Sequence, residues 1–139
     1  MKNIPALQTR LEEVIREFNA DSGTVHVIEN GILMLSASVG IPDQVKTIVA
    51  AVPIGKGMAG LAAQRNEPVT SCNIQTDKTG DVRPGARATN MSGALVVPIR
   101  DANGTVRGTL GIGVQREYTY TAAETEKLFA EAAKLAALG

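Results

Sequence analysis

The stretch from Pro53 to Ala63 constrains the fold more than any other part of this sequence. A short apolar run, Ala51 to Ile54, leads into Gly55-Lys-Gly-Met-Ala-Gly60, and a helical pattern follows at once, from Met58 to Arg65. Glycines at every second or third place predict a strand-to-helix corner where the backbone passes close to something else. A long polar stretch follows, from Ser71 to Ser92, and loops of this length in small domains are usually functional or mobile. Together the two features predict a pocket over a sheet.

The other helices are predicted from apolar spacing and from end signals. Apolar residues recur at steps of three and four from Ile4 to Phe18, which indicates an amphipathic helix. A short helix is expected over Asp43–Val49, and one helical turn near Pro84–Thr89. Thr121-Ala-Ala-Glu124 has the spacing of a capping box, in which the hydroxyl and the carboxylate bind free amides at the start of a helix. That last helix is expected to run to about Leu138.

Two turn signals determine how the strands pair. Asn30-Gly31 and Asp101-Ala-Asn-Gly104 each separate two apolar runs and suit hairpin turns. Both hairpins require antiparallel pairing, so the predicted class is α+β. We expect a central antiparallel sheet of five or six strands, with the N- and C-terminal helices packed on one face and a pocket covered by a loop and a helix on the other. The predicted strands are 24–28, 32–39, 51–54, 68–71, 94–99 and 105–114.

Composition narrows the class of partner. The length of 139 residues predicts a single domain over residues 1–139. The net charge is zero and aromatic residues make up 3%, which argues against a nucleic-acid partner because phosphate binding needs basic groups and single strands need stacking platforms. No apolar run approaches membrane-spanning length. The single cysteine excludes an internal disulfide and suits a reducing compartment, so we expect a cytoplasmic protein without a membrane partner.

Three side chains invite a chemical interpretation. Cys72 is more consistent with a structural cysteine than with a nucleophile or an attachment point, and His26 with a hydrogen-bonded or half-exposed strand residue than with a metal or haem ligand. On strand alternation His26 shares a face with Thr24. The corner with Lys56 lacks the Lys-Ser/Thr ending of a phosphate-binding loop, so tight packing is favoured there. No catalytic or metal-binding residue is assigned.

Two arginines of the polar stretch are the candidates for recognising an anion. The guanidinium groups of Arg83 and Arg87 could hold a carboxylate or phosphate bidentately, but a solvated loop with local ion pairs to Asp77 and Asp81 is the more frequent arrangement. Methionines near the pocket could give it a pliant wall, or could simply fill gaps in a core. The residues predicted to contact a ligand are Met58, Cys72, Asn73, Arg83, Arg87, Met91 and Ser92.

In their order and spacing, these segments resemble the GAF domain, a small sensory fold. The resemblance covers roughly Leu7 to Leu135 and is carried by Gly55-Lys-Gly-Met-Ala-Gly60, Asn66-Glu-Pro-Val69, Ser92-Gly-Ala-Leu-Val-Val-Pro-Ile99 and Gly108-Thr-Leu-Gly-Ile112, with Tyr118 to Glu124 at the last helix. It implies a GAF-like (profilin-like) sheet, a ligand cavity opposite the terminal helices, and a homodimer through those helices. Family members bind different ligands, so the resemblance leaves the ligand and any cofactor unknown.

The resemblance allows three different functions for this chain. The first expectation is a non-enzymatic sensor of a small, polar or anionic metabolite that signals through a dimer or a partner protein. A second is a ligand-free dimerisation or interaction module. A third is an enzyme similar to the free methionine-(R)-sulfoxide reductases of this fold, which use several thiols. Here Ala59 stands where the resemblance implies one of those cysteines, and Cys72 alone cannot re-form a disulfide.

Overall fold

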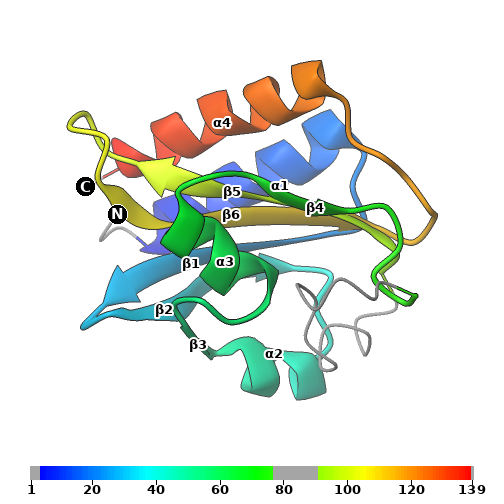
Figure 1. Ribbon diagram of the computed structural model, residues 1–139, viewed down its shortest axis with the longest axis horizontal. Coiled ribbons are helices and arrows are strands. Elements are labelled where there is room, and N and C mark those ends of the chain that lie inside the picture. Colours follow the sequence, from blue (N-terminus) through cyan, green and yellow to red (C-terminus); the bar gives the residue numbers. More distant parts are fainter. Residues whose placement is uncertain (1–3, 77–90, 139) are drawn as a thin grey trace.

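The computed structural model describes residues 4–76 and 91–138, which form a six-stranded antiparallel sheet with helices on both faces (Figure 1). The strand order is β3-β2-β1-β6-β5-β4, so β1 and β6 lie at the centre. The predicted α+β class and antiparallel sheet are confirmed. The elements are α1 (Ile4–Phe18), β1 (Ser22–Glu29), β2 (Ile32–Val39), α2 (Asp43–Val49), β3 (Ala51–Pro53), α3 (Gly57–Arg65), β4 (Val69–Ser71), β5 (Gly93–Arg100), β6 (Val106–Val114) and α4 (Ala122–Ala136).

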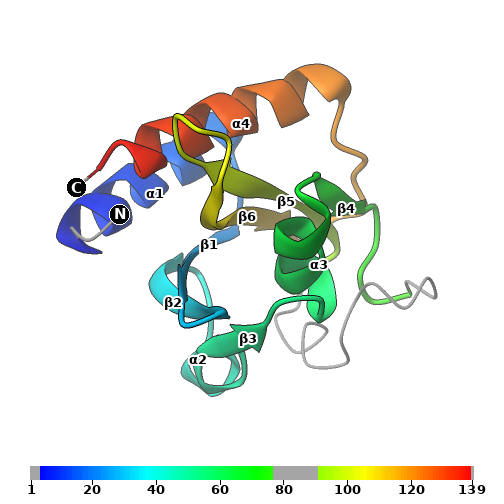
Figure 2. The same ribbon diagram turned by 60° about the vertical axis from the view of Figure 1, so that its left-hand side comes forward.

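The main core lies between the sheet and the pair α1 and α4, which run side by side over one face in both ribbon views (Figures 1 and 2). Each helix buries the stripe that its sequence predicts: Leu7, Leu11 and Val14 from α1, and Leu128, Ala132 and Leu135 from α4. They meet inward-facing strand residues such as Val25, Val97 and Leu110. The expected packing of the terminal helices on one face is therefore confirmed.

The helices on the two faces begin differently. The capping box at α4 is complete: Oγ1 of Thr121 accepts from the amide of Glu124 at 3.1 Å, and Oε1 of Glu124 accepts from the amide of Thr121 at 2.9 Å. The hydroxyl of Tyr118 also donates to Glu124 at 2.8 Å. On the opposite face, α2 and α3 begin at Pro42 and Lys56 with no side-chain cap. The start of α4 is thus held by more hydrogen bonds than the start of either helix opposite.

Both predicted hairpin turns are present. Asn30 and Gly31 adopt φ angles of 51° and 78°, the left-handed values that a two-residue turn requires. In the second turn, the carboxylate of Asp101 accepts from the amides of Asn103 and Thr105 at 2.9 and 3.0 Å. Side-chain bonding of this kind favours a turn over continued strand. These local signals fix which strands become neighbours.

The edge of β2 is only partly covered by its neighbour β3. β3 pairs with residues 32–34 of β2. Beyond that point the amide of Leu35 donates to the carbonyl of Ala50 at 2.9 Å. The side-chain amide of Gln8 on α1 then binds the backbone of Ser38 twice, donating to its carbonyl at 2.9 Å and accepting from its amide at 3.1 Å. The first helix thereby occupies hydrogen-bonding positions that a further strand would use.

Element boundaries differ from the predicted ones by one or two residues at most places. β1 begins at Ser22 rather than Thr24 because Ser22 and Gly23 pair with Gly113 and Ile112 of β6, a contact that the local sequence does not reveal. α4 ends at Ala136 rather than near Leu138. The helical turn predicted near residues 84–89 lies outside the described residues.

Candidate functional site

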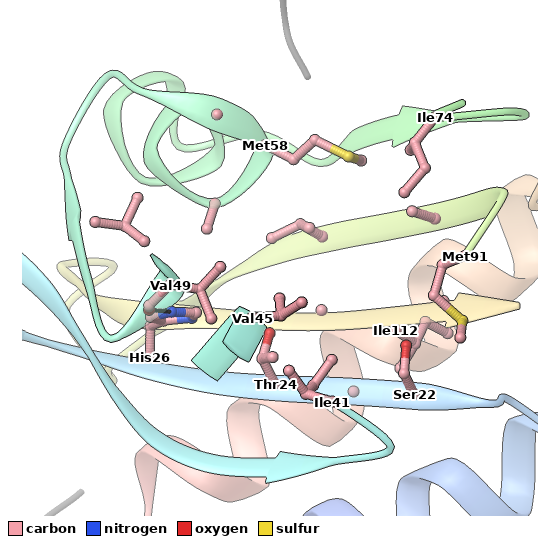
Figure 3. A pocket seen from close by; sticks show the side chains of 18 of the residues that line it. Ser22, Thr24, His26, Ile41, Val45, Val49, Met58, Ile74, Met91 and Ile112 are labelled. Atoms are coloured by element: carbon pink, nitrogen blue, oxygen red, sulfur yellow. Dashed lines mark hydrogen bonds between the residues drawn. The ribbon is translucent and has the colours of Figure 1, made fainter. Parts of the chain in front are cut away.

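A cavity of about 170 Å³ lies on the sheet face opposite α1 and α4 (Figure 3). The strands β1, β5 and β6 contribute its floor, and the walls come from the α2–β3 segment and from the start of α3. An engineered apolar cavity of roughly 150 Å³ is large enough for benzene, so this one has room for a small organic guest. The apolar side chains around it are Ile41, Val45, Ile48, Val49, Val52, Met58, Ala59, Ile74, Met91, Ala94, Val96 and Ile112.

The glycine corner brings the first residues of α3 to the cavity. Gly55 and Gly57 adopt φ angles of 92° and 65°, which residues with a side chain rarely take. At Gly60 an added Cβ would lie 2.5 Å from the carbonyl oxygen of Pro53, so the helix and the preceding strand can approach only without a side chain there. The close approach expected from the sequence is therefore between α3 and the end of β3, which agrees with tight packing. This close packing places Lys56 and Met58 among the residues that line the cavity.

Glycines of β6 keep the floor of the cavity open. Gly111 and Gly113 lie beside β1, where an added Cβ would meet Oγ1 of Thr24 at 3.2 Å and Oγ of Ser22 at 3.0 Å. A side chain at either position would fill space that the cavity now uses. At both positions the missing side chain lets a hydroxyl of β1 pack directly against the backbone of β6. A register shift lies between Ile99 and Arg100 on the partner strand β5, opposite the start of β6.

His26 is the most polar side chain of the floor and is 3% exposed. Its Nε2 lies 2.9 Å from the carbonyl oxygen of Val49, the last residue of α2. A carbonyl only accepts hydrogen bonds, so Nε2 carries a proton. Burial lowers the pKa of His26 below its usual 6.5 and so favours the neutral ring, while the hydrogen bond to the carbonyl of Val49 acts in the opposite direction and raises the pKa. The neutral imidazole protonated on Nε2 leaves Nδ1 as an acceptor, and this buried Nδ1 has no hydrogen-bond partner among the described residues.

The charge around the cavity is sparse. Among its described lining residues only Lys56 carries a formal charge, and this side chain is exposed at the rim. Ser22, Thr24 and His26 are the polar lining residues of β1, and all three point to the same side because their positions alternate along the strand. Such a site suits a guest that is largely apolar and forms few polar contacts.

The structure brings together only part of the predicted ligand-contacting set. Met58 and Met91 line the cavity. Cys72, Asn73 and Ser92 are not among its lining residues: Cys72 is exposed, and the Asn73 side chain donates to Oε1 of Glu117 at 2.8 Å. The backbone carbonyl of Ser92 accepts from the amide of Ile74, and the backbone amide of Ser92 donates to the carbonyl of Val114.

Arg83 and Arg87 lie outside the described residues. Contact of any of the seven predicted residues with a ligand stays a prediction.

Sequence reasoning underrated one element and one side chain. The residues of α2 and its flanks form a wall, which the sequence did not indicate, because only tertiary packing places that helix over the sheet. His26 is hydrogen-bonded, as favoured from the sequence, but it is buried at the floor of the cavity rather than half exposed. The signal that could have found it is alternation, because His26 shares a face with Thr24, and Thr24 lies opposite Gly111 of β6 at the cavity floor.

In residues 4–76 and 91–138, no three His, Cys, Asp or Glu side chains gather in a way that could hold a metal ion. Over the same ranges, none of the helices combines the length and the apolar character needed to cross a bilayer.

Comparison with known proteins gives a family match over nearly the whole chain. The sequence profile described as GAF domain matches residues 5–139. No protein with a curated description matches significantly.

Solved structures with the same fold include GAF domains and free methionine-R-sulfoxide reductases. The GAF domain of a phosphoenolpyruvate-protein phosphotransferase from Coxiella burnetii aligns with a TM-score of 0.82 and 22% identity, covering 99% of this chain and 82% of that one. The type II free methionine-R-sulfoxide reductase from Thermoplasma acidophilum aligns with a TM-score of 0.77 and 20% identity over 95% and 88% of the two chains. The corresponding reductase from Neisseria meningitidis, solved with its substrate, gives 0.79 and 16% over 96% and 75%. At these identities the likeness shows the fold alone.

Proposed function

This chain belongs to the GAF domain family, and we propose that it is a non-enzymatic sensory or regulatory module that binds a small molecule. The observation that carries the proposal is the cavity of about 170 Å³ between the sheet and the helices α2 and α3. It lies on the face opposite α1 and α4, and it is lined by side chains from six strands and helices: β1, α2, β3, α3, β5 and β6. A site with apolar walls and few polar groups is the usual form of a small-molecule site.

The lining indicates what kind of guest the cavity suits. Its walls are aliphatic and methionine side chains, so the buried part of the ligand is largely apolar. Met58 and Met91 would contact it through flexible thioethers, which adapt to the shape of a guest. The expected polar or anionic group of the ligand rests on Arg83 and Arg87. It stays a prediction, because those two residues lie outside the described part of the chain.

A chain of hydrogen bonds supports transmission from the cavity to α4. Ile74 lines the cavity, and its neighbours Cys72 and Asn73 contact the segment before α4. The amide of Tyr118 donates to the carbonyl of Cys72 at 3.1 Å, and Asn73 binds Glu117. The same Tyr118 holds the capping carboxylate of α4. A guest that favours one position of residues 72–74 would therefore shift the start of α4 between two arrangements.

We propose that the signal leaves through the terminal helices, either in a homodimer or to a partner protein. Ala130 and Ala133 are exposed on α4 and Ala137 is exposed at its C-cap, and side chains this small permit a second helix to approach closely. We place this activity in the cytoplasm, where a lone cysteine such as Cys72 stays reduced.

Native mass spectrometry of freshly purified protein tests the proposal by detecting a retained small molecule and the mass of a dimer. A thermal-shift screen of small organic molecules, metabolites and oxo-acids follows. A ligand that binds only the folded state raises the Tm, by an amount that grows with its concentration relative to Kd. Ala94→Leu is the matched variant, because Ala94 lines the cavity and a larger side chain would occupy it. The proposal would be contradicted if the purified protein retained no small molecule and no compound gave a Tm shift that Ala94→Leu abolishes.

The reductase alternative rests on the likeness to two free methionine-R-sulfoxide reductases. Reduction of a sulfoxide by protein thiols ends in a disulfide, which needs a second sulfur. This sequence contains only Cys72, which is exposed and does not line the cavity. We therefore expect no turnover in a coupled reductase assay. Turnover that disappears in Cys72→Ser would establish the enzyme instead.

A further inference from the structure

We propose that the guest of this cavity is a neutral molecule with an apolar body and one hydrogen-bond donor, a hydroxyl or N–H group, which it gives to Nδ1 of His26. This inference rests on the proposed function, since it assigns the chemistry of the guest in the same site. The sequence predicts a polar or anionic metabolite, with Arg83 and Arg87 as the groups that could hold an anion. The present inference instead uses only residues that the structure describes.

The first step is the direction of the hydrogen bonds at His26. Nε2 must donate, since its partner 2.9 Å away is the carbonyl of Val49. This carbonyl belongs to the last turn of α2, where helix carbonyls have no partner within the helix. The bond therefore fixes both the tautomer and the orientation of the ring. A neutral ring held in this way offers a lone pair at Nδ1 and no second proton.

The second step is that this lone pair is unused. Nδ1 is buried and has no hydrogen-bond partner among the described residues. Thr109 is the residue directly opposite His26 on β6, so the two side chains point to the same face. Its hydroxyl is buried and likewise has no partner, so the two side chains do not bond each other. A buried acceptor without a donor is unfavourable, and a guest that supplies the donor removes this cost.

The third step concerns charge and placement. The described lining residues include no carboxylate that could neutralise a cationic guest. An anionic guest would face the lone pair of His26. A neutral donor avoids both penalties. His26 lies at the end of the cavity near Val45 and Val49, whereas Ile74 and Met91 lie at the other end (Figure 3). The donor group would thus sit beneath α2, and the apolar body would extend toward the methionine.

Phenol and toluene are the probe pair that isolates the donor. The two molecules have nearly the same size, slightly larger than benzene, and only phenol carries a donor. Titration calorimetry or NMR gives the ratio of their Kd values with the wild-type protein and with His26→Phe, which keeps a ring and removes Nδ1. We expect the preference for phenol over toluene to fall about tenfold in His26→Phe, the size of one hydrogen bond to a buried acceptor.

The outcomes separate this inference from the proposed function. If both probes bind and the ratio is the same in wild type and variant, the donor assignment is wrong although the cavity binds guests. If neither probe binds, the inference and the proposed function both lose their support. Thr109→Val is the matched control, and we expect it to leave the ratio unchanged. A phenol preference that rises in Thr109→Val would show that the threonine hydroxyl already occupies Nδ1, which would overturn the proposal.

A measurement on the wild-type protein covers the case in which His26→Phe does not fold. The nitrogen chemical shifts of the His26 imidazole report which nitrogen is protonated and whether the other accepts a hydrogen bond. We expect a proton on Nε2, a free acceptor at Nδ1, and a shift of the Nδ1 signal on adding phenol but not on adding toluene. A proton on Nδ1, or equal responses to both probes, would contradict the inference.

Discussion

The two faces of the sheet use the same strands for opposite purposes. On the face under α1 and α4, long aliphatic side chains such as Leu11, Leu110 and Leu128 are fully buried in one continuous core. On the face under α2 and α3, the same strands present glycines and small or polar residues around a cavity. Alternation along a strand makes this possible, because Val25 enters the core and its neighbour His26 the cavity floor. One face can therefore hold the fold together while the other stays free to bind.

The helices on the two faces differ in the same sense. The start of α4 is fixed by a capping box and by Tyr118, whereas α2 and α3 begin without side-chain caps. Segments with few stabilising contacts are the ones that move when proteins bind ligands, because small shifts in them cost little free energy. The comparison thus predicts that changes under α1 and α4 affect stability most, and changes under α2 and α3 affect binding most.

Truncation of one large side chain on each face gives the largest expected difference. Leu110→Ala removes a fully buried side chain of the core and should lower the free energy of unfolding by about 2–5 kcal/mol. Met58→Ala removes a partly buried side chain at the cavity, where contacts are fewer, and should cost about 1 kcal/mol. Urea unfolding measures both values. Equal losses would mean that the two faces contribute alike.

Enlargement of one alanine on each face compares the filled core with the open cavity. Ala37 on β2 is packed in the core, so Ala37→Leu should destabilise by about 1–3 kcal/mol through overpacking. Ala94 on β5 lines the cavity, so Ala94→Leu should change stability by less than about 1 kcal/mol, since its new atoms enter open space. Thermal and urea unfolding of the pair decide the matter, and an equally large loss at both positions would argue for a filled pocket.

Substitutions at the helix caps should change the free energy of unfolding by smaller amounts. Thr121→Ala removes the capping hydroxyl of α4 and should cost about 1 kcal/mol. Lys56→Ser introduces a hydroxyl at the uncapped start of α3, where the backbone is already extended, and should add about 0.5 kcal/mol. Urea titrations of both variants against the wild type measure these changes. A loss in Lys56→Ser would show that the start of α3 is satisfied by other groups.

The pH dependence of His26 gives the smallest effect. Its folded-state pKa lies below the usual 6.5, so the neutral ring is favoured by folding. Its contribution to stability is then complete above pH 6.5 and is lost as the pH falls through the folded-state pKa. Lys56 is the other titratable group among the described lining residues, and its side chain is exposed.

His26→Phe supplies the control for this measurement. Below pH 6.5 the stability of the wild type should fall faster with decreasing pH than that of the variant, because only the wild type takes up a proton at this site on unfolding. Urea midpoints between pH 7.5 and 5 record both slopes. Parallel slopes would show that burial does not depress the pKa of His26.

The fold was predictable where the signals are local. Asn30-Gly31, Asp101 to Gly104 and the Thr121–Glu124 box each determine a turn or a helix start within a few residues, and all three are present in the structure. The apolar stripe of α1 likewise needs no distant partner for its prediction. The order of the sheet is different. Pairing of β1 with β6 joins residues far apart in sequence, and no local pattern specifies it.

The site was predictable only in part, for the same reason. Met58 follows the glycine corner, so its position at a pocket could be inferred. The burial of His26 depends on the carbonyl of Val49, which α2 brings over the sheet through tertiary packing. No pattern near His26 specifies that contact. Cys72 lies near the beginning of the polar stretch, but its position in the sequence does not determine which way an exposed side chain points.

The contact between Gln8 and Ser38 has a consequence for how separate copies of this protein meet. An open strand edge offers free amides and carbonyls to any other chain in solution, and such edges seed aggregates. The Gln8 amide occupies the donor and the acceptor of Ser38 at once. In Gln8→Leu these two groups would be left unpaired on a sheet with an apolar interior, and we expect concentrated samples of that variant to precipitate sooner than the wild type.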